Sequence, residues 1–126
     1  LVAVGWEERG GLRDAGWEIG SHTVTHPHLS RIGDDELATE LRDSAAEIER
    51  RLGACETIAY PYGDHDGRVV AATVEAGYRA AATLPARSER RVQRHAYPRV
   101  GVWHDTTGIR FRMKASPLVR RLRSPS

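Results

Sequence analysis

The sequence contains a single cysteine, Cys55, among 126 residues. One cysteine cannot form an intrachain disulfide, and it excludes structural zinc sites that need two or more thiolates. Stability must therefore come from packing or from a metal site built on other residues.

Long apolar segments are also missing. No apolar run is long enough to span a bilayer. Residues 1–6 are too short a stretch for a signal peptide and have no basic start. The chain begins with Leu1 rather than methionine, so we expect it to be a piece of a longer protein, and the missing signal leaves its location open.

The sequence also lacks a large excess of charge of either sign. The formal net charge is +2, although the pI is about 9.0. A basic end can contact nucleic acid or anionic lipid, but no interleaved aromatics or nucleic-acid motif accompany this one. We interpret residues 116–126 as a solvated basic tail and expect no nucleic-acid partner. The basic residues near this end are Arg110, Arg112, Lys114, Arg120, Arg121 and Arg123.

Helical patterns occur at four places. The clearest is over residues 35–52, where apolar residues recur with a period near 3.6. Shorter helices are predicted over residues 7–15, 67–76 and 108–115. Asp34 and Asp66 are expected caps, and Gly53 and Gly77 expected stops. The expected buried side chains are Leu37, Leu41, Ala45, Ile48 and Leu52 in the long helix, and Val69, Val70, Thr73 and Val74 in the next.

Strands are predicted between these helices, over residues 17–20, 56–60, 78–83 and 97–103, with a loop over 84–96. Alternating strands and helices favour parallel βα units, in one α/β domain over residues 1–115. The chain is short for a closed barrel of about 250 residues. Functional sites in such folds gather at the C-terminal ends of strands.

Two unusual motifs follow predicted strands. SHTVTHPHL places His22 and His26 four residues apart, and two imidazoles on one turn can reach one metal ion. Pro27 disfavours a long helix there. A catalytic zinc site usually has three protein ligands, so one more would be needed. The alternative is a pair of surface histidines in a histidine-rich loop.

The second motif is YPYGDHD, where Tyr62 lies between Pro61 and Gly63. Tyr62 keeps a backbone N–H that can point into a cleft and stabilise an oxyanion. The alternative is a plain turn that ends a strand.

Together, the segments WEIGSHTVTHPHL, TIAYPYGDHD and VVAATVEAGYRAA resemble the polysaccharide deacetylases, the NodB-homology domain of carbohydrate esterase family 4. The resemblance extends from about Trp6 to Trp103. It implies a partial, distorted (β/α) barrel, with fewer strands than the eight of a complete barrel. The implied reaction is metal-assisted hydrolysis of N-acetyl or O-acetyl groups on a glycan. Family members often act at the cell envelope or outside the cell.

The resemblance also implies roles for individual residues. His22 and His26 match the family's metal ligands, for a divalent ion expected to be Zn²⁺. Residues 59–63 match its Arg-Pro-Pro-Tyr-Gly motif, which makes the Tyr62 backbone N–H the oxyanion donor. Ser21 and Thr23 match the small residue before the first ligand and the Ser/Thr after it.

The sequence departs from the family pattern in three ways. The Thr-Phe-Asp-Asp motif, which supplies the catalytic base and the third ligand, is absent. Ala59 replaces an arginine, and Arg99 in YPRVGV is a candidate for that charge. The Leu-x-His motif of the general acid has no clear match, and His65 and His104 are the candidates. Asp64 or Asp66 are alternatives for the missing ligand or base.

Three functions fit these observations: a deacetylase domain lacking its upstream part and inactive or weak alone, a non-catalytic relative that binds metal weakly, and a basic nucleic-acid-binding module. The first is favoured. The particular glycan is not indicated by the sequence. We also expect open strand edges, which favour self-association.

Overall fold

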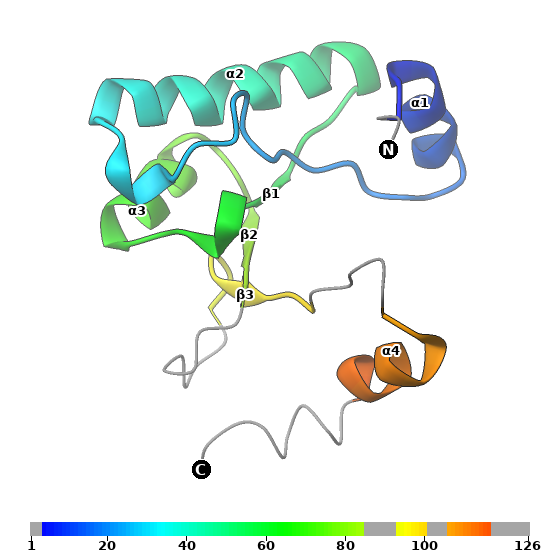
Figure 1. Ribbon diagram of the computed structural model, residues 1–126. Helices are drawn as coiled ribbons and strands as arrows, with labels where there is room; N and C mark the ends of the chain where they lie inside the picture. Colours follow the sequence, from blue (N-terminus) through cyan, green and yellow to red (C-terminus); the bar gives the residue numbers. More distant parts are fainter. Residues whose placement is uncertain (1–3, 85–92, 101–105, 117–126) are drawn as a thin grey trace.

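The computed structural model describes residues 4–84, 93–100 and 106–116. Figure 1 shows helices and short strands in one mixed α/β arrangement, with α2 running along one side of a small sheet. The predicted α/β class is confirmed, and within the described residues the sheet is partial and does not close into a barrel. The division between residues 1–115 and a tail stays a prediction.

The sheet has strand order β1-β2-β3 and is parallel throughout, as predicted. β1 is Thr57–Ala59, β2 is Ala80–Thr83 and β3 is Tyr97–Pro98. β3 ends at Pro98, short of the predicted strand, although the Arg99 N–H still donates to the Thr83 carbonyl. Residues 101–103 of that prediction lie outside the described residues, as does most of the predicted loop.

The predicted strand over residues 17–20 is wrong. Only Ser21 pairs with β1, through a hydrogen bond from its N–H to the Thr57 carbonyl and one from the Ala59 N–H to its own carbonyl. In the register of the Ser21–Ile58 bridge, Gly20 faces Thr57, the first residue of β1, and residues 17–19 have no strand opposite them. Trp17 is exposed instead, and the Glu18 side chain accepts a hydrogen bond from the Thr57 hydroxyl.

Four α-helices are described: α1 (Trp6–Asp14), α2 (Asp34–Leu52), α3 (Gly67–Glu75) and α4 (Gly108–Ala115). Two short 3₁₀ helices, η1 (Leu29–Arg31) and η2 (Pro61–Gly63), flank the candidate site. None of the described helices has the length and hydropathy needed to cross a bilayer.

Two details of the helix predictions are wrong. The N-cap of α2 is Gly33, with extended backbone angles, while Asp34 lies in the first turn and pairs with Arg68. Val74 is 51% exposed, because the buried stripe of α3 follows Val69 and Thr73, four residues apart. The Asp66 cap is confirmed, since its carboxylate accepts a hydrogen bond from the Val69 N–H.

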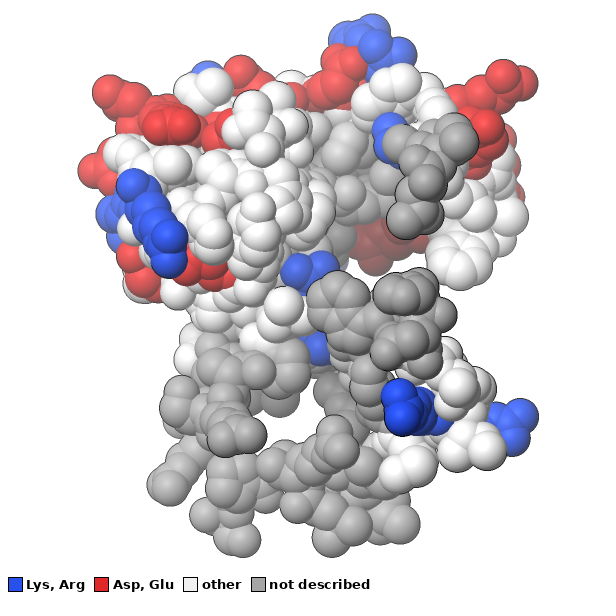
Figure 2. Space-filling model, in the orientation of Figure 1, with Lys and Arg blue, Asp and Glu red and all other residues white. Residues whose placement is uncertain are grey.

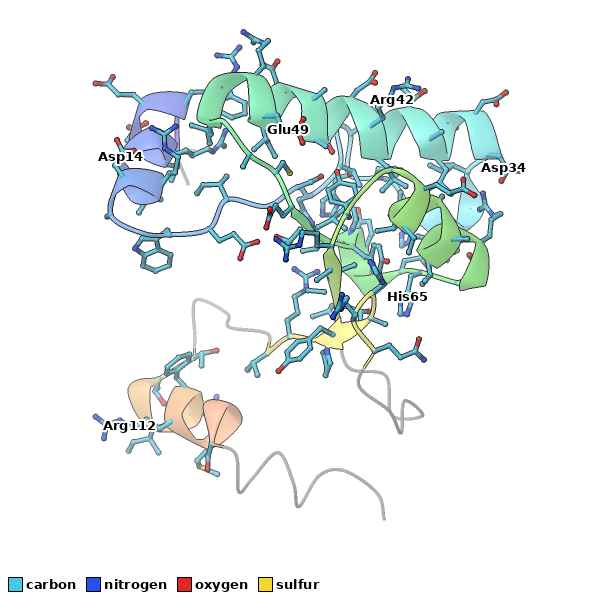
Figure 3. All side chains as sticks on the ribbon, turned by 180° about the vertical axis from the view of Figure 1, so that it is seen from behind. Asp14, Asp34, Arg42, Glu49, His65 and Arg112 are labelled. Carbon is cyan, nitrogen blue, oxygen red and sulfur yellow. The ribbon has the colours of Figure 1, made fainter. Side chains whose placement is uncertain are left out.

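The core lies between α2, α3 and the sheet. The predicted stripe of α2 is buried along its whole length. Its partners include Ile58, Tyr60, Val69 and Tyr78. Charged side chains such as Arg42 project from the solvent face of α2 (Figure 3). Acidic and basic side chains intermix over α2 in Figure 2, as on an ordinary solvated surface.

Candidate functional site

The two motifs lie together at the carboxyl end of β1. The histidine loop, defined as residues 22–26, follows the Ser21 bridge, and η2 follows β1. The His22 and His26 Nε2 atoms are 3.1 Å apart, with the ring centroids 4.7 Å apart. The spacing in the sequence therefore does bring both imidazoles to one point.

The backbone of the histidine loop is unusual. Thr23 and His26 have φ of 68° and 61°, in the left-handed region that non-glycine residues rarely adopt. The Thr23 hydroxyl accepts a hydrogen bond from the His26 N–H, and the Ser21 hydroxyl accepts one from the Thr23 N–H. Short local bonds thus fold the loop back so that its two histidines meet.

His22 is oriented through its second ring nitrogen. Its Nδ1 is 2.5 Å from the Ala59 carbonyl oxygen, which requires Nδ1 to carry the proton and leaves Nε2 with a lone pair. Burial lowers the pKa of His22, the bond to Ala59 opposes this, and the charges of His26 and Arg99 lower it further. The net lowering favours the neutral imidazole, which is the form that binds metal.

Tyr62 lies in the turn after β1, with φ of 58°. No described residue accepts a hydrogen bond from its backbone N–H. The residue is 54% exposed, and its ring lies between His26, with centroids 4.6 Å apart edge to face, and His28, stacked with centroids 4.1 Å apart. The Tyr62 ring and the histidine pair therefore border the same surface.

Arg99, which follows β3, also reaches this surface. Its Nη2 donates a 2.7 Å hydrogen bond to the Tyr60 carbonyl. Its Nε is buried and has no hydrogen-bond partner among the described residues. Its positive charge contributes to the lowering of the His22 pKa.

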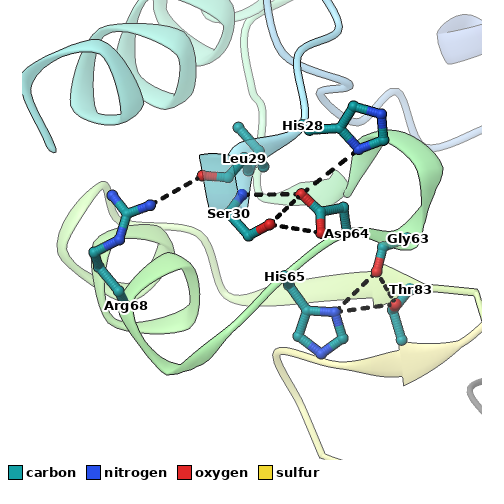
Figure 4. Close-up of polar contacts among 8 residues, drawn as sticks. All are labelled: His28, Leu29, Ser30, Gly63, Asp64, His65, Arg68 and Thr83. Carbon is teal, nitrogen blue, oxygen red and sulfur yellow. Dashed lines mark hydrogen bonds and ion pairs between the residues drawn. The ribbon is translucent and has the colours of Figure 1, made fainter. Parts of the chain in front are cut away.

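The described contacts of the His65 ring are with Tyr60, Gly63 and Thr83 rather than with the histidine pair. Its Nδ1 is 3.0 Å from the Gly63 carbonyl oxygen and 3.2 Å from the Thr83 hydroxyl, and its ring stacks on Tyr60. Figure 4 shows it turned toward Thr83, and Figure 3 shows it on the β3 side of the sheet. His104, the other candidate for a general acid, lies outside the described residues.

The two nearby aspartates have local partners. Asp64 accepts hydrogen bonds from the Ser30 N–H and hydroxyl at 2.8–2.9 Å, and its carboxylate is 3.8 Å from His28 Nδ1 (Figure 4). Burial opposes ionisation of Asp64, but the Ser30 bonds outweigh it and lower its pKa. Asp66 caps α3. Both carboxylates are engaged in holding the fold beside the site.

Glu40 contacts the histidine loop but was not among the predicted site residues. It is a buried carboxylate on α2, 6% exposed, and it accepts hydrogen bonds from Val24 and Thr25. Its position between Leu37 and Leu41, on the apolar stripe of the helix, is the sequence feature that could have identified it. A charged residue on such a stripe is rarely buried without partners.

The histidine pair fits two positions of a metal site. Two nitrogen ligands of a tetrahedral zinc ion, each at about 2.0–2.1 Å, lie about 3.3 Å apart. The observed 3.1 Å is close to this, and the Nδ1 contact of His22 to a carbonyl is the usual support for a ligand histidine. Within the described part of the chain, no third His, Cys, Asp or Glu completes a set of three.

Solved structures with the same fold include three deacetylases. The Streptococcus pyogenes deacetylase PplD, in complex with acetate, is 19% identical, with a TM-score of 0.75 over 90% of this chain. A polysaccharide deacetylase from Bacillus cereus is 28% identical, with a TM-score of 0.74 over 90%. A de-N-acetylase from Aggregatibacter actinomycetemcomitans is 16% identical, with a TM-score of 0.69 over 88%.

This chain spans 51%, 37% and 53% of the lengths of those three structures. A comparison with curated proteins found no significant match. The family model described as polysaccharide deacetylase matches residues 2–81, a stretch that contains the histidine loop, η2 and α2. Because this match covers well over half of the sequence, the chain belongs to the polysaccharide deacetylase family.

Proposed function

We propose that this chain carries one side of an active site that removes acetyl groups from a glycan with the help of a divalent ion, expected to be Zn²⁺. The observation that carries the proposal is the convergence of the His22 and His26 Nε2 atoms, with the Tyr62 ring packed against His26. Family membership supports the reaction class, and a deacetylase of the same fold was solved with acetate.

His22 and His26 would hold the ion through their Nε2 atoms. A bound ion would polarise the acetyl carbonyl and lower the pKa of the attacking water. His22 keeps its ring orientation through the Ala59 carbonyl, and its lowered pKa keeps Nε2 available near neutral pH. The pair therefore needs little rearrangement to bind.

Tyr62 would stabilise the negative charge that develops on the carbonyl oxygen. An N–H that is held rigidly and left without a partner suits this role, because it needs no reorganisation during the reaction. Pro61 has a fixed φ, and the Gly63 N–H donates to the Tyr60 carbonyl across the turn, so the backbone around Tyr62 is restricted.

Arg99 would supply the positive charge that Ala59 lacks. Its Nε is buried and has no hydrogen-bond partner among the described residues, so a shift of the side chain would free it to donate to a carboxylate at the site. We propose that this carboxylate is the catalytic base, which Arg99 would orient. His65, which follows the Tyr62 turn in the sequence, is the proposed general acid, and its Nδ1 faces Gly63 and Thr83.

The third ligand and the base would come from sequence beyond the described residues. Asp64 and Asp66 are held by Ser30 and by the α3 N-terminus, so neither is placed to act without rearrangement. We therefore propose that this chain alone turns over acetylated sugars weakly. A missing base removes a contribution of roughly 10²–10⁴-fold in rate.

Metal titration tests the ligand pair. Zn²⁺ and Co²⁺ binding is measured calorimetrically for the chain and for His22→Ala, His26→Ala and His95→Ala. His95 is the matched control, because its Nε2 contacts the Tyr78 carbonyl rather than the pair. We expect binding to be lost in the first two variants and kept in the third. Equal binding in all four would exclude the pair as ligands.

Acetate release tests the reaction. The substrates are N-acetylated chito-oligosaccharides and a small aryl acetate, with added Zn²⁺ or Co²⁺, for this chain and for a version extended upstream. We expect turnover in the extended version, abolished by His22→Ala, and little in this chain alone. Metal binding without turnover in both versions would favour the non-catalytic alternative.

A further inference from the structure

Glu40 is a buried carboxylate whose described partners all lie in the histidine loop. One carboxylate oxygen accepts hydrogen bonds from the Val24 N–H at 2.7 Å and the Thr25 N–H at 3.0 Å. The other accepts one from the Thr25 hydroxyl at 2.6 Å. The side chain comes from the second turn of α2, so it links the longest described helix to the loop.

Val24 and Thr25 lie between the two histidines. The loop is bounded by Thr23 and His26, whose left-handed backbones are unfavourable for residues with side chains. A conformation of this kind persists only where the surroundings hold it. The three bonds to Glu40 act on the two residues between the strained positions, and they satisfy two backbone N–H groups there.

The stiffness of α2 makes Glu40 an effective anchor. Its neighbours Leu37 and Leu41 are 1% and 0% exposed, so the helix is fixed against the core at this turn. The carboxylate is therefore presented from a rigid element, whereas the loop itself contains no regular structure. Rigid support of this type is what holds ligand side chains in place around metal sites.

We propose that Glu40 is a positioning residue that holds residues 23–26 in the conformation where His22 and His26 converge, so that the pair is formed before an ion binds. The metal part of this inference rests on the proposed function. The loop part does not, because it concerns the metal-free chain.

Two substitutions separate positioning from a general contribution to stability. Glu40→Gln keeps the length of the side chain, and its amide oxygen can still accept from both backbone N–H groups while Thr25 turns to accept from the amide. Glu40→Ala leaves all three loop donors without their partner. We expect metal affinity to fall roughly 10–100-fold in the alanine variant, as for other residues that support ligands, and to be largely rescued in the glutamine variant.

Two controls accompany these variants in calorimetric Zn²⁺ and Co²⁺ titrations. Glu36→Ala removes an exposed glutamate one turn earlier on the same helix. Leu52→Ala destabilises the core about 18 Å further along α2. Both should keep the parent affinity. An equal loss in Leu52→Ala and Glu40→Ala would overturn the proposal, because stability alone would then explain the effect.

Amide hydrogen exchange in the metal-free chain provides a readout that needs no ion. We expect the Val24 and Thr25 amides to exchange much faster in Glu40→Ala, and near the parent rate in Glu40→Gln. Unchanged exchange would overturn the proposal even if metal binding changed. If the parent binds no metal, the proposed function fails, while the exchange data still decide the role of Glu40.

Thr25→Val covers the case in which Glu40→Ala does not fold. It removes only the hydroxyl bond to Glu40 and nearly preserves the shape of the side chain. We expect a smaller loss of metal affinity and faster exchange at Val24 and Thr25. Parent values for both would count against the proposal.

Discussion

Backbone conformation at three residues distinguishes the candidate site from the rest of the described chain. Thr23, His26 and Tyr62 are the non-glycine residues with positive φ among those described, and all three border the histidine pair. Each such conformation costs on the order of 1–3 kcal/mol and tends to occur where function needs it. The same geometry brings the imidazoles together and leaves the Tyr62 N–H without a partner.

Gly63 is the residue at which a single methyl group should disturb this geometry. Its φ is +71°, and an added Cβ would lie 2.7 Å from the Leu84 backbone nitrogen. We expect Gly63→Ala to lower the free energy of unfolding by about 1–3 kcal/mol. Urea unfolding would measure this.

The control for this prediction is Gly11→Ala. Gly11 lies inside α1, where an added Cβ meets nothing within 4 Å, so alanine should stabilise the helix by about 0.5–1 kcal/mol. A Gly63→Ala variant as stable as the parent would show that η2 tolerates the methyl group.

At the residue scale, the sequence predicted that the His22 and His26 side chains converge, and their rings do meet. His22 and His26 are four residues apart, so local geometry alone could bring them together. Arg99 was a candidate only by its charge, and its approach to Tyr60 depends on the pairing of β3 with β2. Glu40 was missed because its partners are 15 and 16 residues away in the chain.

At the element scale, helices were predicted better than strands. The apolar stripe of α2 is a property of its own residues, and it is buried as expected. A strand depends on its neighbour instead, and the run Trp17–Gly20 failed because β1 offers a partner only from Thr57 onward. The prediction that Val74 is buried was wrong because α3 buries only Val69 and Thr73, a narrower stripe than its run of apolar residues indicates.

The N-terminus of α3 offers a test at this scale. The Asp66 carboxylate accepts a 2.8 Å hydrogen bond from the Val69 N–H. We expect Asp66→Ala to lower the free energy of unfolding by about 1 kcal/mol, and Asp66→Asn to change it little, because both aspartate and asparagine cap helices well. Thermal unfolding followed by circular dichroism would compare them. Equal losses in both variants would mean that the charge, rather than the cap, is what matters.

At the scale of the whole molecule, the open edges of the sheet bear on whether copies of the chain associate. Ser21 at one side and β3 at the other have no further strand partner among the described residues. Unpaired edges present free N–H and C=O groups to other chains. We therefore expect self-association that increases with concentration. Sedimentation velocity over a concentration series would reveal it, and a monomer throughout would contradict it.

Acidification tests how the whole fold depends on two partly or fully buried carboxylates, Glu40 and Asp64. Burial by itself would raise both pKa values, but the hydrogen bonds they accept outweigh it and lower both, from ordinary values of 4.5 and 3.8. The unfolded chain therefore takes up protons first as the pH falls. The stabilisation is complete above the ordinary values and is lost as the pH falls through the lowered ones.

We expect the free energy of unfolding, measured in urea from about pH 7 to pH 3, to decline steeply below about pH 4.5. The double variant Glu40→Gln, Asp64→Asn should show a flatter decline, because neither amide titrates. Glu36→Gln, an exposed change on α2, is the matched control and should keep the parent slope. A double variant with the parent slope would place the acid sensitivity elsewhere in the molecule. A flattened slope would show that the bonds from Glu40 to the histidine loop and from Asp64 to Ser30 in η1 contribute to the stability of the whole chain.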